Sequence, residues 1–220
     1  MSFEQPESIA IIGAGLSGLA CANALADAGA SVRVYDKGRG PGGRTSTRRV
    51  EIDGAELSFD HGAQYFTVRD TRFERYVQSW IADGIVATWH GRICTLTNGR
   101  IEWKNERTPR FVGVPGMNAI CRHLAADLDI AFGTQVGPPR FDDGIWQLRD
   151  RQERYLGEFD CVISSAPAPQ SAELLAAAAD LQQQTRSVKM RGCWAAMLSF
   201  EEPLELPFDG AFVGQSLLSW

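Results

Sequence analysis

The sequence predicts an α/β protein organised around a parallel β-sheet, and three features lead to this prediction. The apolar run 8–12 is followed by a glycine-rich turn and by apolar residues at helical spacing that end at Gly29. The apolar run 31–35 comes next, so strand, helix and strand follow in the order that joins parallel strands. A third apolar run, 159–164, has the composition of a strand at the centre of such a sheet.

The same patterns predict the remaining elements in chain order. Apolar residues at helical spacing predict helices at 71–81, 117–128 and 168–179. Short apolar or alternating runs predict strands within 85–103 and at 111–114, 130–132, 145–149 and 193–200. Asn98-Gly99 is a typical hairpin turn, and the glycine- and arginine-rich stretch 39–44 predicts a loop.

Composition and charge narrow the functional class. The 220 residues can form one large or two small domains, and 44% hydrophobic with 22% charged residues is the balance of a globular protein. A net charge of -5 and an isoelectric point near 5.3 argue against a general nucleic-acid-binding protein, which would carry a basic face. Five scattered cysteines without a CxxC pair argue against a zinc site or a disulfide scaffold, and predict reduced thiols in a cytoplasmic protein.

Residues 9–30 are apolar enough to raise the question of a leader peptide or a membrane span. Glycines interrupt the run, and Ser17, Asn23 and Asp27 are too polar for either. We therefore expect this segment to form a strand, a turn and a helix, and we expect no membrane association.

The strongest motif is Gly13-Ala14-Gly15-Leu16-Ser17-Gly18, which fits GxGxxG at the junction of the first strand and the first helix. A diphosphate is negatively charged and binds well against backbone amides at a helix N-terminus. Gly13 permits the tight turn, Gly15 has no Cβ in the way of the phosphates, and Gly18 lets the helix pack close to the strand. The motif predicts a dinucleotide site that includes Gly13, Ala14, Gly15, Ser17 and Gly18.

Asp36 ends the second strand, 18 positions beyond Gly18, where a carboxylate can accept hydrogen bonds from both hydroxyls of a ribose. The acid disfavours a 2′-phosphate and therefore NADP, whereas the motif alone does not separate NAD from FAD. The alternative is a glycine-rich turn in an ordinary α/β protein. The order of strand, helix, second strand and acid argues against that alternative.

A second glycine-rich loop, Lys37–Thr45, follows directly. Gly42 and Gly43 let the backbone approach a ligand, and Arg44 can make a charge-assisted contact. The run resembles the GGR loop of glutathione-reductase-type flavoproteins, in the branch that includes amine oxidases and phytoene desaturases. The resemblance implies that Lys37, Gly42, Gly43 and Arg44 lie beside bound FAD. The alternative is a solvated basic loop.

Three later segments resemble renalase-like FAD-dependent oxidoreductases of the flavin amine oxidase superfamily. They are FDHGAQYFT at 59–67, VPGMNAI at 114–120 and SAPAPQ at 165–170. The resemblance implies that Gly62, Ala63, Gln64 and Tyr65 lie along the flavin, and that Val136 contacts the adenine side through its backbone. On residue type alone, the alternative for Tyr65 is a place in an aromatic core.

The same resemblance implies a Rossmann-like FAD-binding domain of the glutathione-reductase type with an inserted α+β substrate domain. The FAD-binding parts are predicted at 1–75 and 111–185, and the substrate-domain parts at 76–110 and 186–220. Relatives continue beyond the equivalent of Trp220, so the substrate domain is expected to be incomplete and to lack the family's C-terminal part.

The resemblance implies an oxidase with non-covalently bound FAD. A hydride would pass from a dihydronicotinamide-type substrate, an isomer of NAD(P)H, to the flavin, and O₂ would reoxidise it and yield H₂O₂. One alternative is a flavin amine oxidase that acts on a small amine, and a second is a non-catalytic dinucleotide-binding module. The sequence leaves the oligomeric state open.

Other chemistries find less support in the sequence. The three histidines are His61, His90 and His123, and His123 lies two positions from Cys121 on a predicted helix. Residues two apart on a helix point to different faces, so no metal site is expected. No catalytic acid, base or nucleophile is assigned.

Overall fold

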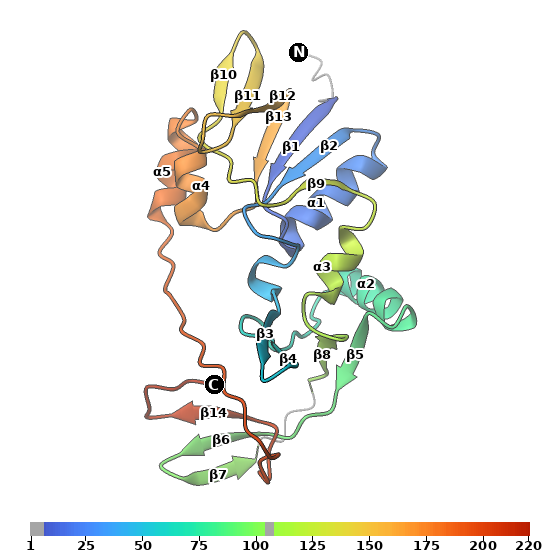
Figure 1. Ribbon diagram of the computed structural model, residues 1–220, viewed down its shortest axis with the longest axis vertical. Helices are drawn as coiled ribbons and strands as arrows, with labels where there is room; N and C mark the ends of the chain where they lie inside the picture. The colour runs from blue at the N-terminus through green and yellow to red at the C-terminus, as the bar shows by residue number, and fades with distance from the viewer. Residues whose placement is uncertain (1–6, 104–107) are drawn as a thin grey trace.

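The computed structural model describes residues 7–103 and 108–220 (Figure 1). Two short stretches lie outside the described residues. They are 1–6, in the predicted FAD-binding segment 1–75, and 104–107, in the predicted substrate-domain segment 76–110.

A four-stranded parallel sheet with the order β13-β1-β2-β9 forms one half of the molecule. Its strands are β1 (Ser8–Ile12), β2 (Ser31–Tyr35), β9 (Asp129–Ala131) and β13 (Cys161–Ser164). The helix α1 (Leu16–Asp27) connects β1 to β2, as the apolar spacing predicts. Ile9 faces Val32 on one side and Cys161 on the other, so β1 lies at the centre.

Apolar side chains cover both faces of this sheet. On the α1 face, Ile11, Leu19 and Val34 are fully buried and pack with Cys121. On the other face, Tyr35 and Phe159 pack edge to face, with ring centroids 6.2 Å apart, beside buried Leu148. The near-continuous apolar runs of the strands follow from burial on both faces.

Two further units cover this half. An antiparallel sheet consists of β10 (Arg140–Asp142), β11 (Ile145–Arg149) and β12 (Tyr155–Phe159). Two helices, α4 (Ala168–Leu174) and α5 (Ala179–Ser187), follow β13 and lie beside these strands (Figure 1). Of the predicted helix 168–179, only 168–174 is helical before a turn at 175–178, and Ala179 begins the separate helix α5. The side-chain amide of Gln182 on α5 donates to the Ala172 carbonyl at 2.8 Å, near the end of α4.

The other half contains short strands and two helices. Its elements are β3 (Arg48–Ile52), β4 (Ala55–Phe59), α2 (Thr71–Ala82), β5 (Val86–Trp89), β6 (Ile93–Thr97), β7 (Arg100–Trp103), β8 (Arg110–Gly113), α3 (Ala119–Leu124) and β14 (Gly210–Gly214). β5 pairs with β8, and β14 joins β6 and β7 in one sheet. Val77, Trp80 and Phe111 form a core between α2 and the β5–β8 pair.

Local chemistry explains several element boundaries. α2 begins where the Asp70 carboxylate accepts the Arg72 amide at 2.8 Å. Asn98 and Gly99 have φ values of 49° and 77°, which confirms the hairpin turn between β6 and β7. α3 is shorter than the predicted helix 117–128, and the chain continues beyond it in shorter turns. The Asn23 side chain donates to the Leu124 carbonyl at 2.7 Å and so satisfies one of the carbonyls at the helix end.

The strand predicted at 193–200 is wrong. Residues 188–200 have no helix or strand, and among the described residues this stretch pairs with no strand. Apolar residues there give the β-pattern, but a strand also needs a partner for its backbone groups. In its place, the segment runs in an extended path from α5 toward β14 (Figure 1), and Trp194 is 100% exposed.

Candidate functional site

A cavity of about 510 Å³ lies where the parallel strands end. Ile12, Tyr35 and Ser165 line it at or next to the carboxyl ends of β1, β2 and β13. In open α/β sheets, ligands bind outside the carboxyl ends of the strands. The volume is also within the usual range for a small-molecule site.

The GxGxxG segment forms the inner wall of this cavity. The Gly13 amide donates to the Tyr35 carbonyl at 2.8 Å, which fixes the turn between the two strands. A Cβ on Gly18 would come within 2.5 Å of Ser165 Oγ and would also overlap the Gly13 carbonyl, so this position packs helix against strand. At Gly15 a Cβ would meet only Gly43 Cα, at 3.8 Å, and Gly15 lines the cavity.

The N-terminus of α1 faces the cavity without a capping side chain. The N-cap position is Gly15, which has no side chain. The first turn of α1 therefore receives no side-chain hydrogen bond from its N-cap residue. The first amides of a helix have no partner within the helix. Leu16 and Ser17 line the cavity, so the positive end of the helix dipole is directed at this space.

Asp36 is held rigidly at the cavity wall by two backbone amides. Ala14 donates to Oδ2 and Gly38 donates to Oδ1, both at 2.6 Å. The Ala14 amide is therefore occupied by a side chain, and Ala14 itself is fully buried. A carboxylate has about four acceptor positions, so Asp36 retains capacity for a ligand hydroxyl. Its predicted role at a ribose stays a prediction.

The second glycine-rich loop packs onto the first. The Gly42 amide donates to the Ala14 carbonyl at 3.0 Å, and a Cβ on Gly43 would lie 3.1 Å from Gly15 Cα. A short 3₁₀ turn, η1 (Gly43–Thr45), follows, and the Thr45 hydroxyl donates to the Gly42 carbonyl at 2.9 Å. The loop is thus a fixed wall. Lys37, Gly42, Gly43 and Arg44 all line the cavity.

Four predicted residues, Gly62 to Tyr65, lie beyond this wall rather than in the cavity lining. The Ala63 amide donates to the Arg44 carbonyl at 3.0 Å, and a Cβ on Gly62 would overlap the same carbonyl. Gln64 is exposed. Tyr65 packs between Trp89 and Trp220, with ring centroids 5.6 and 5.5 Å away, and the Arg110 guanidinium lies 5.4 Å from its ring centroid.

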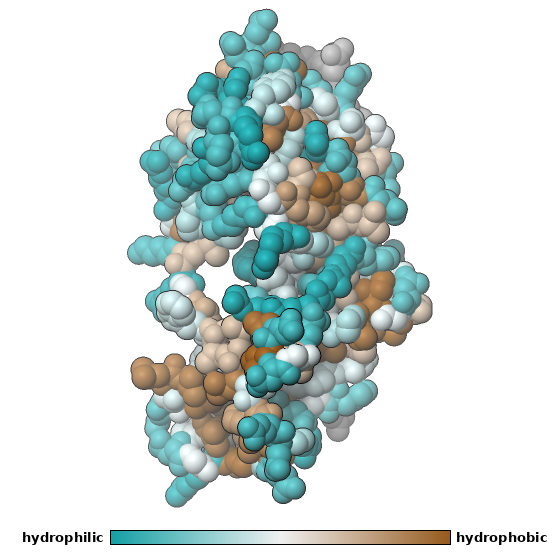
Figure 2. All heavy atoms as spheres, viewed as in Figure 1, coloured by the Kyte–Doolittle hydropathy of each residue, from teal (hydrophilic) through white to brown (hydrophobic). Residues whose placement is uncertain are grey.

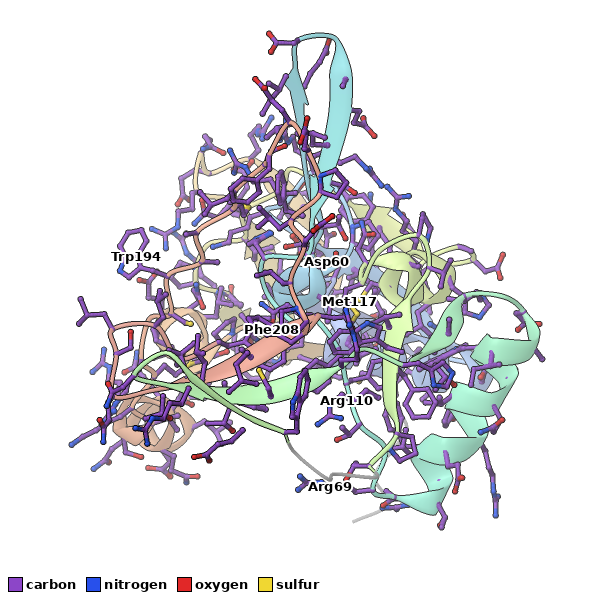
Figure 3. The ribbon with its side chains drawn as sticks, turned by 90° about the horizontal axis from the view of Figure 1, so that it is seen from below. Asp60, Arg69, Arg110, Met117, Trp194 and Phe208 are labelled. Carbon is purple, nitrogen blue, oxygen red and sulfur yellow. The ribbon has the colours of Figure 1, made fainter. Side chains whose placement is uncertain are left out.

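Asp60 fastens the start of this segment to the N-terminal side of α3. Its carboxylate accepts the Met117 amide at 3.0 and 3.1 Å and the Thr47 hydroxyl at 2.5 Å. Figure 3 shows Asp60 and Met117 next to each other near the centre of the view, whereas Trp194 points outward at its edge. The flanking His61 has a buried Nδ1 with no hydrogen-bond partner among the described residues.

Several cavity residues were not predicted from the sequence. They are Leu16, Thr45, Thr134, Gln135, Arg151, Ser165, Ala166, Pro167, Gln170, Glu173 and Leu174, besides Ile12 and Tyr35 at the strand ends. Gln170 belongs to the SAPAPQ segment, and the resemblance of that segment to renalase-like enzymes was a signal that could have placed it in the site. Thr134 comes to the site because its amide donates to the Asp36 carbonyl at 2.9 Å. Val136, which was predicted, also lines the cavity.

Two absences complete the description of the site. No group of three or more His, Cys, Asp or Glu residues in 7–103 and 108–220 could hold a metal ion. Among the described helices, none is both long and apolar enough to cross a membrane.

Comparison with known proteins agrees with this architecture. Residues 11–80 match the family model of an NAD(P)-binding Rossmann-like domain. A carotenoid 3,4-desaturase from Haloarcula japonica is 41% identical over 76 residues, which are 34% of this chain and 14% of the desaturase. The chain thus matches a small part of that relative's length.

Solved structures extend the likeness over most of the chain. Putrescine oxidase bound to putrescine superposes with a TM-score of 0.56 at 15% identity, over 76% of this chain and 60% of the oxidase. A protein from Photorhabdus luminescens described as an FAD-containing monooxygenase gives 0.51 at 11% identity, over 78% and 42% of the two chains.

These comparisons confirm the predicted fold class: the protein has an α/β Rossmann-like dinucleotide-binding fold with a parallel sheet. The finer resemblance to renalase-like enzymes stays a prediction. The inserted substrate domain stays a proposal as well; β14 pairs with β6 in the structure.

Proposed function

We propose that the chain is the FAD-binding part of an FAD-dependent oxidoreductase. One observation carries the proposal: the uncapped start of α1 and the loop Gly42–Arg44 face the same cavity at the strand ends. A site for NAD alone would need the helix N-terminus, but it would leave the loop Gly42–Arg44 without a role. The names of the similar proteins, a desaturase, an oxidase and an FAD-containing monooxygenase, support the same class of chemistry.

The residues present fit a non-covalently bound FAD. The amides at the start of α1 suit the diphosphate, and Gly15 leaves the space that the phosphates require. Asp36 suits the ribose, and Lys37 and Arg44 add positive charge along the cavity. The segment hydrogen-bonded to Arg44 offers a surface for the flavin beyond the cavity wall.

We propose a dihydronicotinamide-type substrate, an isomer of NAD(P)H, for this site. Bound FAD would supply the redox chemistry by accepting a hydride from that substrate and reducing O₂ to H₂O₂. The chain's own residues would hold the dinucleotide in the cavity. The support for this substrate is the resemblance of the segments at 62–65, 115–118 and 167–170.

A second candidate function is the oxidation of a small amine. The structural likeness to putrescine oxidase favours it, as does the aromatic cluster of Tyr65, Trp89 and Trp220. Aromatic faces attract cationic ammonium groups. The third possibility, a non-catalytic dinucleotide-binding module, uses the same cavity without a reaction.

The visible spectrum of the purified protein tests the cofactor. We expect flavin absorption bands, and we expect acid precipitation to release the flavin into the supernatant. Protein that stays colourless after incubation with FAD would contradict the proposal. Flavin that remains with the precipitate would contradict non-covalent attachment.

Anaerobic reduction distinguishes the substrate classes. We expect isomers of dihydronicotinamide nucleotides to bleach the flavin bands, and we expect air to restore them with release of H₂O₂. Bleaching by putrescine or other simple amines, with none by the nucleotides, would establish the amine oxidase alternative. A flavin that no donor reduces would favour the binding module.

Gly15→Val tests the assigned geometry. The new side chain would project into the cavity, where only Gly43 Cα lies within 4 Å of the added Cβ, so we expect at least a roughly 100-fold weaker affinity for FAD with an unchanged melting temperature. Gly40→Ala is the matched control, because a Cβ there meets nothing within 4 Å. Normal FAD binding by Gly15→Val, measured by flavin fluorescence, would show that the diphosphate does not bind here.

A further inference from the structure

Two side chains of opposite charge meet at the outer edge of the cavity. Arg151 lies in the turn between β11 and β12, and Glu173 lies on α4, so they come from two different parts of the cavity wall. The Arg151 guanidinium donates to Glu173 Oε2 in a close ion pair. Both residues line the cavity, and their side chains are 48% and 59% exposed, which places the pair between the cavity and solvent.

The turn that carries Arg151 is held in place by buried Asp150. The Asp150 carboxylate accepts the amides of Gln152 and Arg154, both at 2.9 Å, and Arg154 Nε at 2.6 Å. Burial raises the pKa of Asp150, but the hydrogen bonds from Arg154 and Gln152 outweigh it and hold the pKa below its usual value. The Arg151 amide also donates to the Gln135 carbonyl at 2.9 Å.

The part of the wall formed by α4 is equally well anchored. Ser171 on α4 is buried, and its hydroxyl lies 2.8 Å from both Ser164 Oγ on β13 and the Ala166 carbonyl. Glu173 follows two positions later and therefore has a fixed base. The ion pair therefore joins two parts of the wall that are each fixed by their own hydrogen bonds. If the pair breaks, the cavity opens at this point while both parts of the wall keep their structure.

We propose that Arg151 and Glu173 form a clasp across the mouth of the nucleotide cavity and thereby slow the release of the bound dinucleotide. This inference rests on the proposed function, because it needs FAD in the cavity. The pair is half exposed, so solvent and salt screen it, and its effect on binding is modest. The clasp acts on the rate of dissociation, through which affinity differences in one site usually arise.

The experiment measures the dissociation rate of FAD from the purified holoprotein, by the rise in flavin fluorescence when released FAD is trapped. We expect Arg151→Gln and Glu173→Gln each to increase this rate by about two- to fivefold. The double variant should be no faster than either single variant, because each substitution opens the same pair. The charge-swapped variant R151E/E173R should restore a rate close to that of the unaltered protein.

A second ion pair, between Glu153 of the same turn and Arg140 of β10, provides the control. Arg140 and Glu153 are 3.5 Å apart, exposed, and outside the cavity lining. Arg140→Gln and Glu153→Gln should leave the rate unchanged, whereas added salt should raise the rate of the unaltered protein toward that of the clasp variants. Additive effects in the double variant, or an effect of Arg151→Gln alone, would overturn the clasp. Failure of the unaltered protein to bind FAD would instead refute the proposed function.

Discussion

The half built on the parallel sheet and the half that contains β6, β7 and β14 differ in how they bury apolar side chains. In the first, Ile11, Leu19 and Val34 have no exposed surface. In the second and in the segment that leads to it, Trp194 is fully exposed and Leu198 is 70% exposed. Figure 2 shows the broadest area of hydrophobic surface at the lower left of the molecule, with smaller patches in the upper half and at the right.

The difference indicates that the first half holds the cavity rigid, whereas β14 and the segment before it only extend the molecule. The cavity walls rest on a close-packed core, and close packing fixes side chains in single arrangements. β14 contains no buried residue, and a parallel backbone ladder holds it to β6. Polar contacts of Arg92 with Asp209 and of Asn98 with Gln215 flank the pair. The binding geometry should therefore be insensitive to changes in the second half that would be costly in the first.

Removing one leucine side chain from the first half and one from the segment that leads to the second should give the largest contrast. Leu19→Ala leaves a cavity between α1 and the sheet and should lower the free energy of unfolding by about 2–5 kcal/mol. Leu198→Ala removes an exposed side chain and should change it by no more than about 0.5 kcal/mol. Urea denaturation followed by circular dichroism measures both, and similar losses would contradict the comparison.

Adding one methyl group at the helix–strand junction should have a smaller effect. Gly18→Ala places a Cβ against the Gly13 carbonyl and Ser165 Oγ, so we expect about 1–3 kcal/mol of destabilisation. The matched variant Gly40→Ala should stay within about 0.5 kcal/mol of the unaltered protein. Equal stability of the two variants would mean that Gly18 is not a close packing contact.

The smallest predicted effect concerns a polar contact in the second half. Hydrogen bonds from the Arg92 side chain and amide lower the pKa of Asp209 from 3.8 to about 2. Because the pKa is lowered by folding, this contact contributes stability above about pH 4 and loses it as the pH falls toward 2. The ¹³C shift of the Asp209 carboxyl should titrate near pH 2, and Arg92→Gln should return the midpoint toward 3.8. A midpoint near 3.8 in the unaltered protein would contradict the contact.

Local signals explain what could be predicted from the sequence. The first strand, helix and second strand depend on apolar spacing and glycines close together in the chain, and the structure has them at 8–35. The strand at 193–200 failed because pairing depends on a partner that no local pattern reveals. The hairpin of β3 and β4 and the strand β14 were missed, although Asp53-Gly54 is a good turn signal between β3 and β4.

The candidate site divides in the same way. Gly13, Gly15, Asp36 and the loop Gly42–Arg44 were found because their motifs are contiguous, and all of them line the cavity. Arg151 and Glu173 were missed, since they come from a turn and a helix that only the folded chain brings together. The predicted ligand contact of Ala14 stays a prediction. In the structure its amide donates to Asp36, a contact between two strand ends that no contiguous motif reveals.

The contact between the two glycine loops has a consequence for protein engineering. Gly42 donates to Ala14 and Gly43 lies against Gly15, although about 28 positions separate them in the sequence. A chimera that combined residues 8–36 of this chain with the following loop of another protein would bring together two surfaces that never adapted to each other. The two loops should be grafted as one cassette.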